Sequence, residues 1–181
     1  MNALVVYESV YGNTRAVADA IAHGLSSASL CPVSQVTNQD IARCDLLVVG
    51  GPTHMHGMTT KRSRELAAEM ARADGKFPVD EHADVEPGLR SWLQTLTAGP
   101  GTSVAAFDTR LEGSPLMTGM ASHGIARRLR RKGFELVASE SFLVASSEGP
   151  MAPGELERAR QWGADLAARV RRTATAVAAG R

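Results

Sequence analysis

The chain has 181 residues, of which 44% are apolar and 22% are charged, so its composition excludes disordered, collagen-like and coiled-coil proteins. Its 20 Lys and Arg against 19 Asp and Glu leave a formal charge of +1, too small to direct the whole surface to nucleic acid or an anionic membrane. Only two cysteines occur, far apart, which disfavours disulfides and zinc sites. We therefore expect one domain over residues 1–181, soluble and cytoplasmic, with no membrane span and no nucleic-acid partner.

Three short apolar runs predict the central strands of a parallel sheet. They cover residues 3–7, 46–50 and 104–107, and no polar side chain interrupts them, as in strands that are buried on both faces. Two weaker candidates, 31–36 and 134–144, contain a proline or charged residues and suit the edges. Because the most apolar strands belong in the centre, we predict an α/β fold with a doubly wound five-stranded sheet in the order 2-1-3-4-5.

Helical patterns fill the intervals between these strands. Val17, Ile21 and Leu25 recur at four-residue spacing after the first strand. The further predicted helices are 59–73, 88–96, 119–132 and a long C-terminal helix whose stripe includes Leu156 and Val170. Residues 74–87, with two prolines and five acidic residues, are predicted to be a solvated surface insertion, and 173–181 a tail that can fray. The alternation of strands and helices implies right-handed crossovers that cover both faces of the sheet.

The loop after the first strand, residues 7–14, has the composition of an anion site. Its polar side chains are Ser9, Asn13 and Thr14. Gly12 allows a close backbone approach, and Asn13 or Thr14 can cap the next helix, whose free N–H groups attract an anion. The loop itself holds no Lys or Arg, so amides and hydroxyls would neutralise a phosphate, with Arg15 beside them. An ordinary capped turn is the alternative, and the loop alone leaves both open.

Several motifs of related folds are absent from the sequence. It contains no G-x-x-x-x-G-K-[ST], no G-x-S-x-G, and no G-x-G-x-x-G after the first strand. The third strand ends Gly50-Gly51-Pro52-Thr53, without the aspartate of a response-regulator receiver. These absences disfavour nucleoside-triphosphate, hydrolase, dinucleotide and receiver sites.

The N-terminal segment resembles the signature of the flavodoxin family. The match is Val5-Val6-Tyr7-x-Ser9-x-x-Gly12-x-Thr14, followed by Ala18 and Ile21. The resemblance implies FMN as the cofactor, with its phosphate wrapped by Ser9, Val10, Tyr11, Gly12, Asn13 and Thr14. Val10 stands where the family signature avoids valine. Tyr11, which replaces a common threonine, also occurs in flavodoxin-like quinone reductases.

The resemblance further implies that the isoalloxazine ring lies between two later loops. The first loop begins Gly-Pro-Thr as in the family and would supply Pro52, Thr53, His54, Met55, His56 and Gly57. Gly57 would allow a peptide reorientation beside the flavin N5. A metal site at His54 and His56 is the competing interpretation, which is disfavoured because no Asp, Glu or Cys accompanies the pair.

The second ring loop, residues 107–119, lacks the Tyr or Trp that flavodoxins usually stack on the flavin. Asp108, Thr109 and Arg110 would contact the polar edge of the ring, and Met117, Leu111 or a backbone edge would cover its face. For Arg110, an internal salt-bridged turn is equally open.

One strong charge cluster stands outside these loops, formed by Arg127, Arg128, Arg130, Arg131 and Lys132. It falls at a helix C-terminus, which a crossover helix places at the end of the sheet opposite the ligand. We therefore interpret it as a solvated face that interacts favourably with the helix dipole, with a docking patch as the alternative.

The predicted function is that of an FMN-binding redox protein. A pI of about 7.9 lacks the acidic bias of electron-transfer flavodoxins, and so favours an oxidoreductase that takes hydride from NAD(P)H and reduces a quinone-like acceptor. A carrier that docks on protein partners and a non-redox module that has lost flavin stay open. The sequence identifies no catalytic residue, and it does not specify donor, acceptor or oligomeric state.

Overall fold

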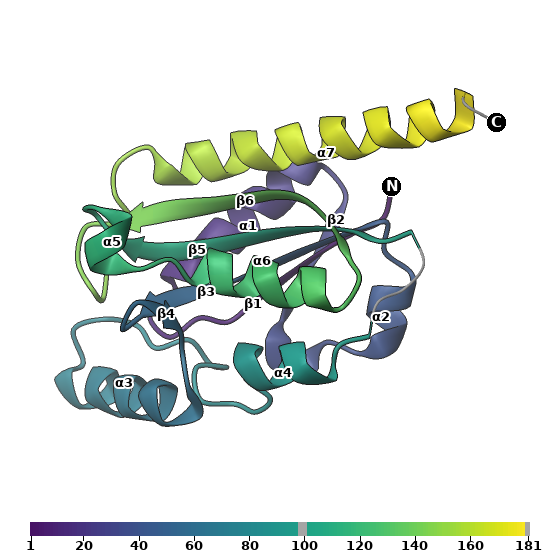
Figure 1. Cartoon of the computed structure of the whole chain (residues 1–181). Coiled ribbons are helices and arrows are strands. Elements are labelled where there is room, and N and C mark those ends of the chain that lie inside the picture. Colours follow the sequence, from purple (N-terminus) through teal and green to yellow (C-terminus); the bar gives the residue numbers. More distant parts are fainter. Residues whose placement is uncertain (98–100, 180–181) are drawn as a thin grey trace.

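The computed structural model describes residues 1–97 and 101–179, and its centre is one twisted sheet (Figure 1). Five parallel strands stand in the order β2-β1-β3-β5-β6. They are β1 (Ala3–Tyr7), β2 (Ala28–Pro32), β3 (Leu46–His54), β5 (Ser103–Leu111) and β6 (Glu135–Val144). A short sixth strand, β4 (Gly57–Met58), pairs antiparallel with the end of β3. The predicted fold class and strand order are confirmed, and β4 is an addition.

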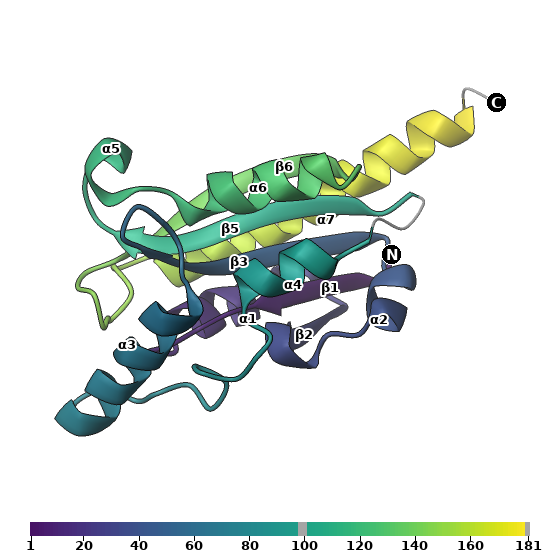
Figure 2. The ribbon, with the colours of Figure 1, turned by 60° about the horizontal axis from the view of Figure 1, so that its bottom comes forward.

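Helices cover both faces of the sheet (Figures 1 and 2). On one face lie α1 (Asn13–Leu25) and α7 (Glu155–Ala179), and on the other lie α2 (Asn38–Ala42), α4 (Leu89–Thr95) and α6 (Ala121–Arg131). The remaining helices, α3 (Lys61–Asp74) and α5 (Pro115–Thr118), extend the end of the sheet where the parallel strands finish. None of the helices in 1–97 and 101–179 is long and apolar enough to cross a membrane.

The two apolar cores explain why the strands are continuous apolar runs. Successive residues of β1 point to opposite faces, so that Val6 packs under α4 and α6 while Val5 packs under α1 and α7. Helices α1 and α7 approach closely through two glycines. A Cβ on Gly24 would stand 1.9 Å from the Arg160 carbonyl oxygen, and one on Gly163 would stand 2.3 Å from that of Ile21.

The second strand differs from its prediction. It runs over Ala28–Pro32, and Val33–Gln35 form a 3-10 turn in place of the predicted strand end. The early start follows from Ser26, whose left-handed φ of 67° ends α1 and turns the chain straight back into the sheet. Helix α2 was not predicted, although Thr37 and Asp40 form a capping box at its start.

The insertion at 74–87 is held to the protein more firmly than a solvated loop. Ala83 is fully buried, and the side chain of Asp80 is 1% exposed. The Asp80 N–H donates to the Val10 carbonyl at 2.8 Å, which joins the insertion to the loop after β1. At the other end of the chain, α7 continues through Ala179, and residues 180 and 181 lie outside the described ranges. Fraying of 173–181 stays a prediction.

Candidate functional site

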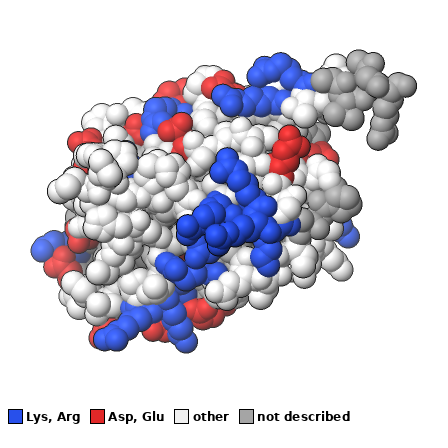
Figure 3. Space-filling model, viewed as in Figure 1, with Lys and Arg blue, Asp and Glu red and all other residues white. Residues whose placement is uncertain are grey.

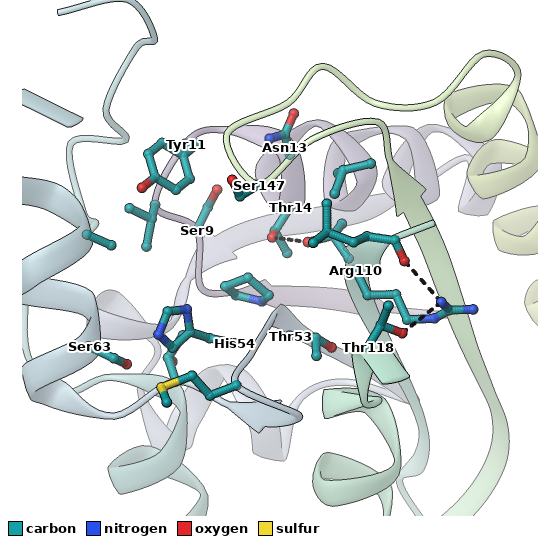
Figure 4. Close-up of a pocket in the computed structure, with 18 of the residues that line it drawn as sticks. Ser9, Tyr11, Asn13, Thr14, Thr53, His54, Ser63, Arg110, Thr118 and Ser147 are labelled. Carbon is teal, nitrogen blue, oxygen red and sulfur yellow. Dashed lines mark hydrogen bonds between the residues drawn. The ribbon is translucent and has the colours of Figure 1, made fainter. Parts of the chain in front are cut away.

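A cavity of about 360 Å³ opens where β1, β3 and β5 end (Figure 4). Its walls come from the loop after β1, the β3–β4 turn, the first turns of α3, the end of β5 with α5, and the loop after β6. Ligands of open parallel sheets bind at this edge, and the volume lies within the range of small-molecule sites. All the predicted site residues line the cavity except Gly12, Gly57 and Asp108. The role of these residues in binding stays a prediction.

The loop after β1 presents the N-terminus of α1 to the cavity. Gly12, with a φ of 83°, is the residue before the helix, and no side chain caps the helix there. Asn13 and Thr14 therefore lie inside its first turn and do not cap it, contrary to one prediction. The first N–H groups of a helix have no partner within it, and together with the helix dipole they attract anions.

Hydrogen bonds from distant segments fix this loop. The Ser9 hydroxyl accepts from the Gly12 N–H at 3.1 Å, and the Asn13 amide donates to the Glu148 carbonyl at 2.9 Å. The hydroxyls of Thr14 and Thr109 are 2.7 Å apart, so β5 holds the first turn of α1 (Figure 4). Because Ser9 and Thr14 are both nearly fully buried, their hydroxyls are held in place before a ligand arrives.

A buried ionic cluster supports the loop from behind. Glu8 is 3% exposed and accepts from the Thr59 hydroxyl and from the Leu89 N–H at 2.7 Å. Its other partner is Arg64, 2% exposed, with 3.2 Å between Nη1 and Oε2. The Arg64 guanidinium also contacts Glu86, so it connects the loop after β1 to the insertion. A buried carboxylate is tolerated only when its charge and its lone pairs are matched in this way.

The ring loop after β3 is a tight hairpin. Thr53 pairs with Met58 and His54 pairs with Gly57, which leaves Met55 and His56 as the two turn residues. Both have left-handed φ, 46° and 68°, the pattern of a type I′ turn that usually holds Asn-Gly. Such angles cost side-chain-bearing residues of order 1 kcal/mol each, so this turn is strained. Gly57 follows this turn and pairs with His54, and the peptide reorientation expected of it stays a prediction.

Comparison with known proteins supports one family. The flavodoxin domain model matches residues 4–71. The structure is similar to a flavodoxin from the domain Archaea, with a TM-score of 0.60, 20% identity, and 94% of this chain and 99% of that chain covered. The flavodoxin of Streptococcus pneumonia TIGR4 is similar with a TM-score of 0.61 and 19% identity, over 93% of this chain and 99% of that chain. A WrbA-like flavodoxin from Agrobacterium tumefaciens is similar with a TM-score of 0.55 and 18% identity, over 94% of this chain and 98% of that chain. The chain has a flavodoxin-like fold, and its N-terminal residues match the flavodoxin domain model. No curated protein sequence matches it significantly, and at these identities the structural likeness establishes the fold alone.

Asp108 does not line the cavity. It is fully buried, and its Oδ2 accepts from the Ser122 N–H at 2.7 Å and from the Thr53 hydroxyl at 3.1 Å. The Thr53 hydroxyl in turn accepts from the Ala121 N–H. Asp108 thus caps α6 from a neighbouring strand and places negative charge at the positive end of its dipole. The carboxylate is thus engaged by Thr53 and Ser122 and does not line the cavity, and its predicted contact with the polar edge of a ring stays a prediction.

Arg110 lines the cavity but turns back on its own loop. Its Nη1 donates to the Leu111 and Gly113 carbonyls at 3.1 and 2.9 Å and to the Thr118 hydroxyl at 3.1 Å (Figure 4). No ion pair with Asp108 is found among the residues that the structure describes. The turn that we considered as an alternative therefore exists, but carbonyls and a hydroxyl form it instead of a salt bridge.

The sequence reasoning missed part of the lining. The missed residues are Thr59, Ser63 and Ala67 at the start of α3, Thr118 near Arg110, and Val144 and Ser147 after β6. The capping box of Thr60 and Ser63 marks the start of α3 in the sequence and could have placed that helix N-terminus nearby. Ser147 carries no comparable signal, since its loop reaches the site only through the fold.

The two histidines at the β3–β4 turn, His54 and His56, are not part of a larger group of metal-ligand side chains among the described residues. Across 1–97 and 101–179, no three His, Cys, Asp or Glu side chains gather as a metal site would require. Both His54 and His56 are exposed at the mouth of the cavity. Of the two cysteines, Cys44 is buried, and burial raises the pKa of its thiol to about 11.

Proposed function

We propose that this chain binds FMN in the cavity and uses it to transfer electrons. The observation that carries the proposal is the uncapped N-terminus of α1, which opens into a cavity beside the buried hydroxyls of Ser9 and Thr14. These donors suit a phosphate. Bound FMN would supply hydride and single-electron chemistry, and the protein would supply binding, orientation and polarity.

The charge of the lining supports the fit to a phosphate ester. None of the residues that line the cavity is an Asp or a Glu, so an anion meets no repulsive carboxylate there. Neutralisation falls to amides and hydroxyls because Arg15, predicted as a helper, pairs instead with Glu81 at 3.5 Å and Asp80 at 3.9 Å. A phosphate bound here would keep more of its charge than one held by arginine.

The remaining walls support the placement of the ring. Thr53, His54 and Met55 come from one side and Thr109 and Met117 from the other, as expected for two loops that enclose a flat heterocycle. Neither tryptophan lines the cavity: Trp92 is a residue of α4 buried in the core, and Trp162 packs edge to face on Phe142. Methionine and histidine side chains would therefore shield the ring from water in this protein.

A titration tests FMN binding. Purified protein is mixed with FMN and the flavin absorption spectrum is followed for the wild type and for Ser9→Ala/Thr14→Ala. We expect the double variant to bind more weakly by about 1 to 3 kcal/mol, because two donors are lost. Thr14→Ser, which keeps a hydroxyl opposite Thr109, should recover much of the affinity.

Ser27→Ala/Ser29→Ala, two exposed hydroxyls near β2, is the matched control and should bind as the wild type does. Equal FMN affinity in the control and in the Ser9/Thr14 variant would refute this phosphate site. Circular dichroism of each variant separates loss of binding from loss of fold.

The finer proposal is an oxidoreductase that takes hydride from NAD(P)H and passes electrons to a quinone-like acceptor. The near-neutral charge of the chain supports it, since an acidic surface would repel a negatively charged dinucleotide. Stopped-flow mixing of the flavin-loaded protein with NADH and with NADPH tests it. Bleaching of the flavin absorbance on mixing is the expected result.

The second candidate is an electron carrier that docks on a redox protein, and the rim of the cavity favours it. Met55 and Met117 line the cavity and are 85% and 77% exposed, and Leu116, beside Met117 in α5, is 91% exposed. Apolar side chains in such a place are typical of protein contacts. Flavin bleached by a flavoprotein reductase, and by neither dinucleotide, would establish the carrier.

A further inference from the structure

A second hollow, of about 370 Å³, lies next to the flavin cavity and is lined by cationic side chains. It is enclosed by the β3–β4 turn, the first turn of α4 and the outer face of α6. The side chains used below are His56, Arg90, His123, Arg127 and Arg128. Figure 3 shows Lys and Arg gathered over α6 on this face. His56 lines both hollows, so they meet at the strained turn.

Two members of the charge cluster therefore do not lie where the sequence placed them. Arg127 and Arg128 belong to the second half of α6, Arg128 in its last turn, yet both line this hollow, whereas Lys132 follows the helix and donates to the Gln94 carbonyl. The predicted remoteness from the ligand end does not hold for these two side chains, and that of Arg128 reaches back one turn to the Gly124 carbonyl.

The positive charge of the hollow is not balanced by carboxylates. Within 1–97 and 101–179, no Asp or Glu oxygen lies within 4.0 Å of Arg90, Arg127 or Arg128, although Arg64 and Arg72 both have such partners. Burial, followed by the charges of Arg90, Arg127 and Arg131, lowers the pKa of Arg128. Like charges gathered without counter-charges raise the energy of the free protein, and a bound anion would relieve that repulsion.

Backbone contacts hold two of the guanidinium groups in place. The Arg90 Nε donates to the Thr59 carbonyl at 3.0 Å, and its Nη2 donates to that of Met58. The Arg128 Nη1 donates to the Gly124 carbonyl at 3.2 Å. Each guanidinium has five N–H donors, so several remain for a ligand. These side chains offer donors and positive charge, which together suit a phosphate, and arginine binds phosphate in a bidentate way.

We propose that this hollow binds the phosphomonoester of a small ligand whose other end reaches the flavin cavity past His56. Resting on the proposed function, the ligand is a hydride-donating dinucleotide that carries an extra ribose phosphate, so the protein favours NADPH over NADH. The concave shape and the shared His56 favour such a ligand over an acidic protein surface, which needs a broad contact.

Binding of 2′,5′-ADP, measured by calorimetry at low salt, tests the phosphate site without any flavin chemistry. We expect 2′,5′-ADP to bind at least tenfold more tightly than 5′-AMP, and Arg127→Glu to weaken it at least tenfold. Arg130→Glu is the matched control, since Arg130 is an exposed arginine of the same helix outside the hollow, and it should bind like the wild type.

Equal binding of 2′,5′-ADP by Arg127→Glu and Arg130→Glu would overturn the site. Inorganic phosphate that binds as tightly as 2′,5′-ADP would overturn the dinucleotide assignment and identify free phosphate as the ligand. A poly-glutamate peptide that binds more tightly than 2′,5′-ADP, with the same dependence on Arg127, would overturn the proposal in favour of an acidic protein partner.

Turnover of the flavin-loaded protein tests the donor itself. We expect the ratio of kcat/KM for NADPH to that for NADH to exceed ten, to fall at least tenfold in Arg127→Glu, and to stay unchanged in Arg130→Glu. A ratio near one in the wild type would overturn the preference. Tight 2′,5′-ADP binding without flavin reduction by either dinucleotide would overturn the donor role and the oxidoreductase function, while the phosphate site would stand.

Discussion

The two sides of the cavity that we propose for flavin are built in opposite ways. On the phosphate side, Ser9 and Thr14 are nearly fully buried and hydrogen-bonded, and the buried pair Glu8 and Arg64 supports them. On the ring side, Met55 is 85% exposed and sits in a left-handed turn. An anchor for a constant phosphate gains from being rigid. The ring side of the cavity is more open, which suits the proposed entry of the flavin ring and the approach of an electron donor or acceptor.

The phosphate side should be the more sensitive to substitution, and Arg64→Met is its strongest test. The change leaves the Glu8 carboxylate buried without a counter-charge, so we expect the free energy of unfolding to fall by about 3 kcal/mol. Urea titration of the variant measures the loss. Arg62→Met, on the exposed face of the same helix, should change stability by less than about 0.5 kcal/mol.

A double-mutant cycle sharpens this test. If the uncompensated charge of Glu8 causes the loss, Glu8→Gln/Arg64→Met should be more stable than Arg64→Met alone, because the glutamine carries no charge and still accepts from Leu89. Simple additivity of the two single changes would mean that packing, and not charge, gives Arg64 its importance.

The base of the ring side should be the next most sensitive, through Asp108. Asp108→Ala removes the acceptor of the Ser122 N–H and of the Thr53 hydroxyl at the start of α6. We expect a loss of about 2 kcal/mol of folding free energy. FMN affinity, measured by the same titration as above, should change far less than in Ser9→Ala/Thr14→Ala. A large loss of FMN affinity with unchanged stability would instead support a direct contact between Asp108 and the flavin ring.

The phosphate side was also the predictable side, for a physical reason. Its residues are consecutive, from Ser9 to Thr14, and lie between a strand and a helix. Residues that are neighbours in such a short loop are also neighbours in the fold, so the sequence alone groups them. The strand order followed in the same way from continuous apolar runs, since burial on both faces leaves no place for polar residues.

What the sequence could not give depends on contacts between distant segments. Ser147 joins the cavity because its loop is tied to Asn13 through the Glu148 carbonyl. Arg90 and Arg127 are far apart in the chain and meet only because α4 and α6 cover the same face of the sheet. Asp108 was placed in a loop by the sequence, but β5 continues through it to Leu111. Within a strand, successive side chains point to opposite faces of the sheet, so the length of the strand decides which residues face the cavity.

Substitution in the turn of the ring side should raise stability. Asparagine tolerates left-handed angles better than methionine, so Met55→Asn should increase the free energy of unfolding by about 1 kcal/mol. Thermal and urea unfolding of the apoprotein measure the gain. Met70→Asn, an exposed methionine inside α3, is the control and should bring no gain. No gain in Met55→Asn would mean that the turn is not strained, and the contrast between the two sides would weaken.

The smallest expected effect is a pH dependence at the wall that carries Val144 and Ser147. Burial alone would raise the pKa of the Glu155 carboxyl, but hydrogen bonds from the Arg158 guanidinium and from the Leu143 N–H at 2.6 Å lower it below its ordinary value of 4.5. Since the folded pKa is the lower one, the stabilisation is complete above pH 4.5 and is lost as the pH falls through the folded value.

Glu155→Gln keeps an acceptor for Leu143 but has no charge to lose, so its advantage should grow on acidification. Between pH 7 and pH 3.5, the wild type should lose about 0.5 kcal/mol more than this variant. Urea titrations at both pH values measure the difference, with Glu157→Gln, an exposed carboxylate of the same helix, as the control. Because Glu155 holds the end of β6 beside the cavity, the same acidification should weaken FMN binding by the wild type more than by Glu155→Gln. Parallel losses in the wild type and Glu155→Gln would show that the charge of Glu155 does not stabilise this wall.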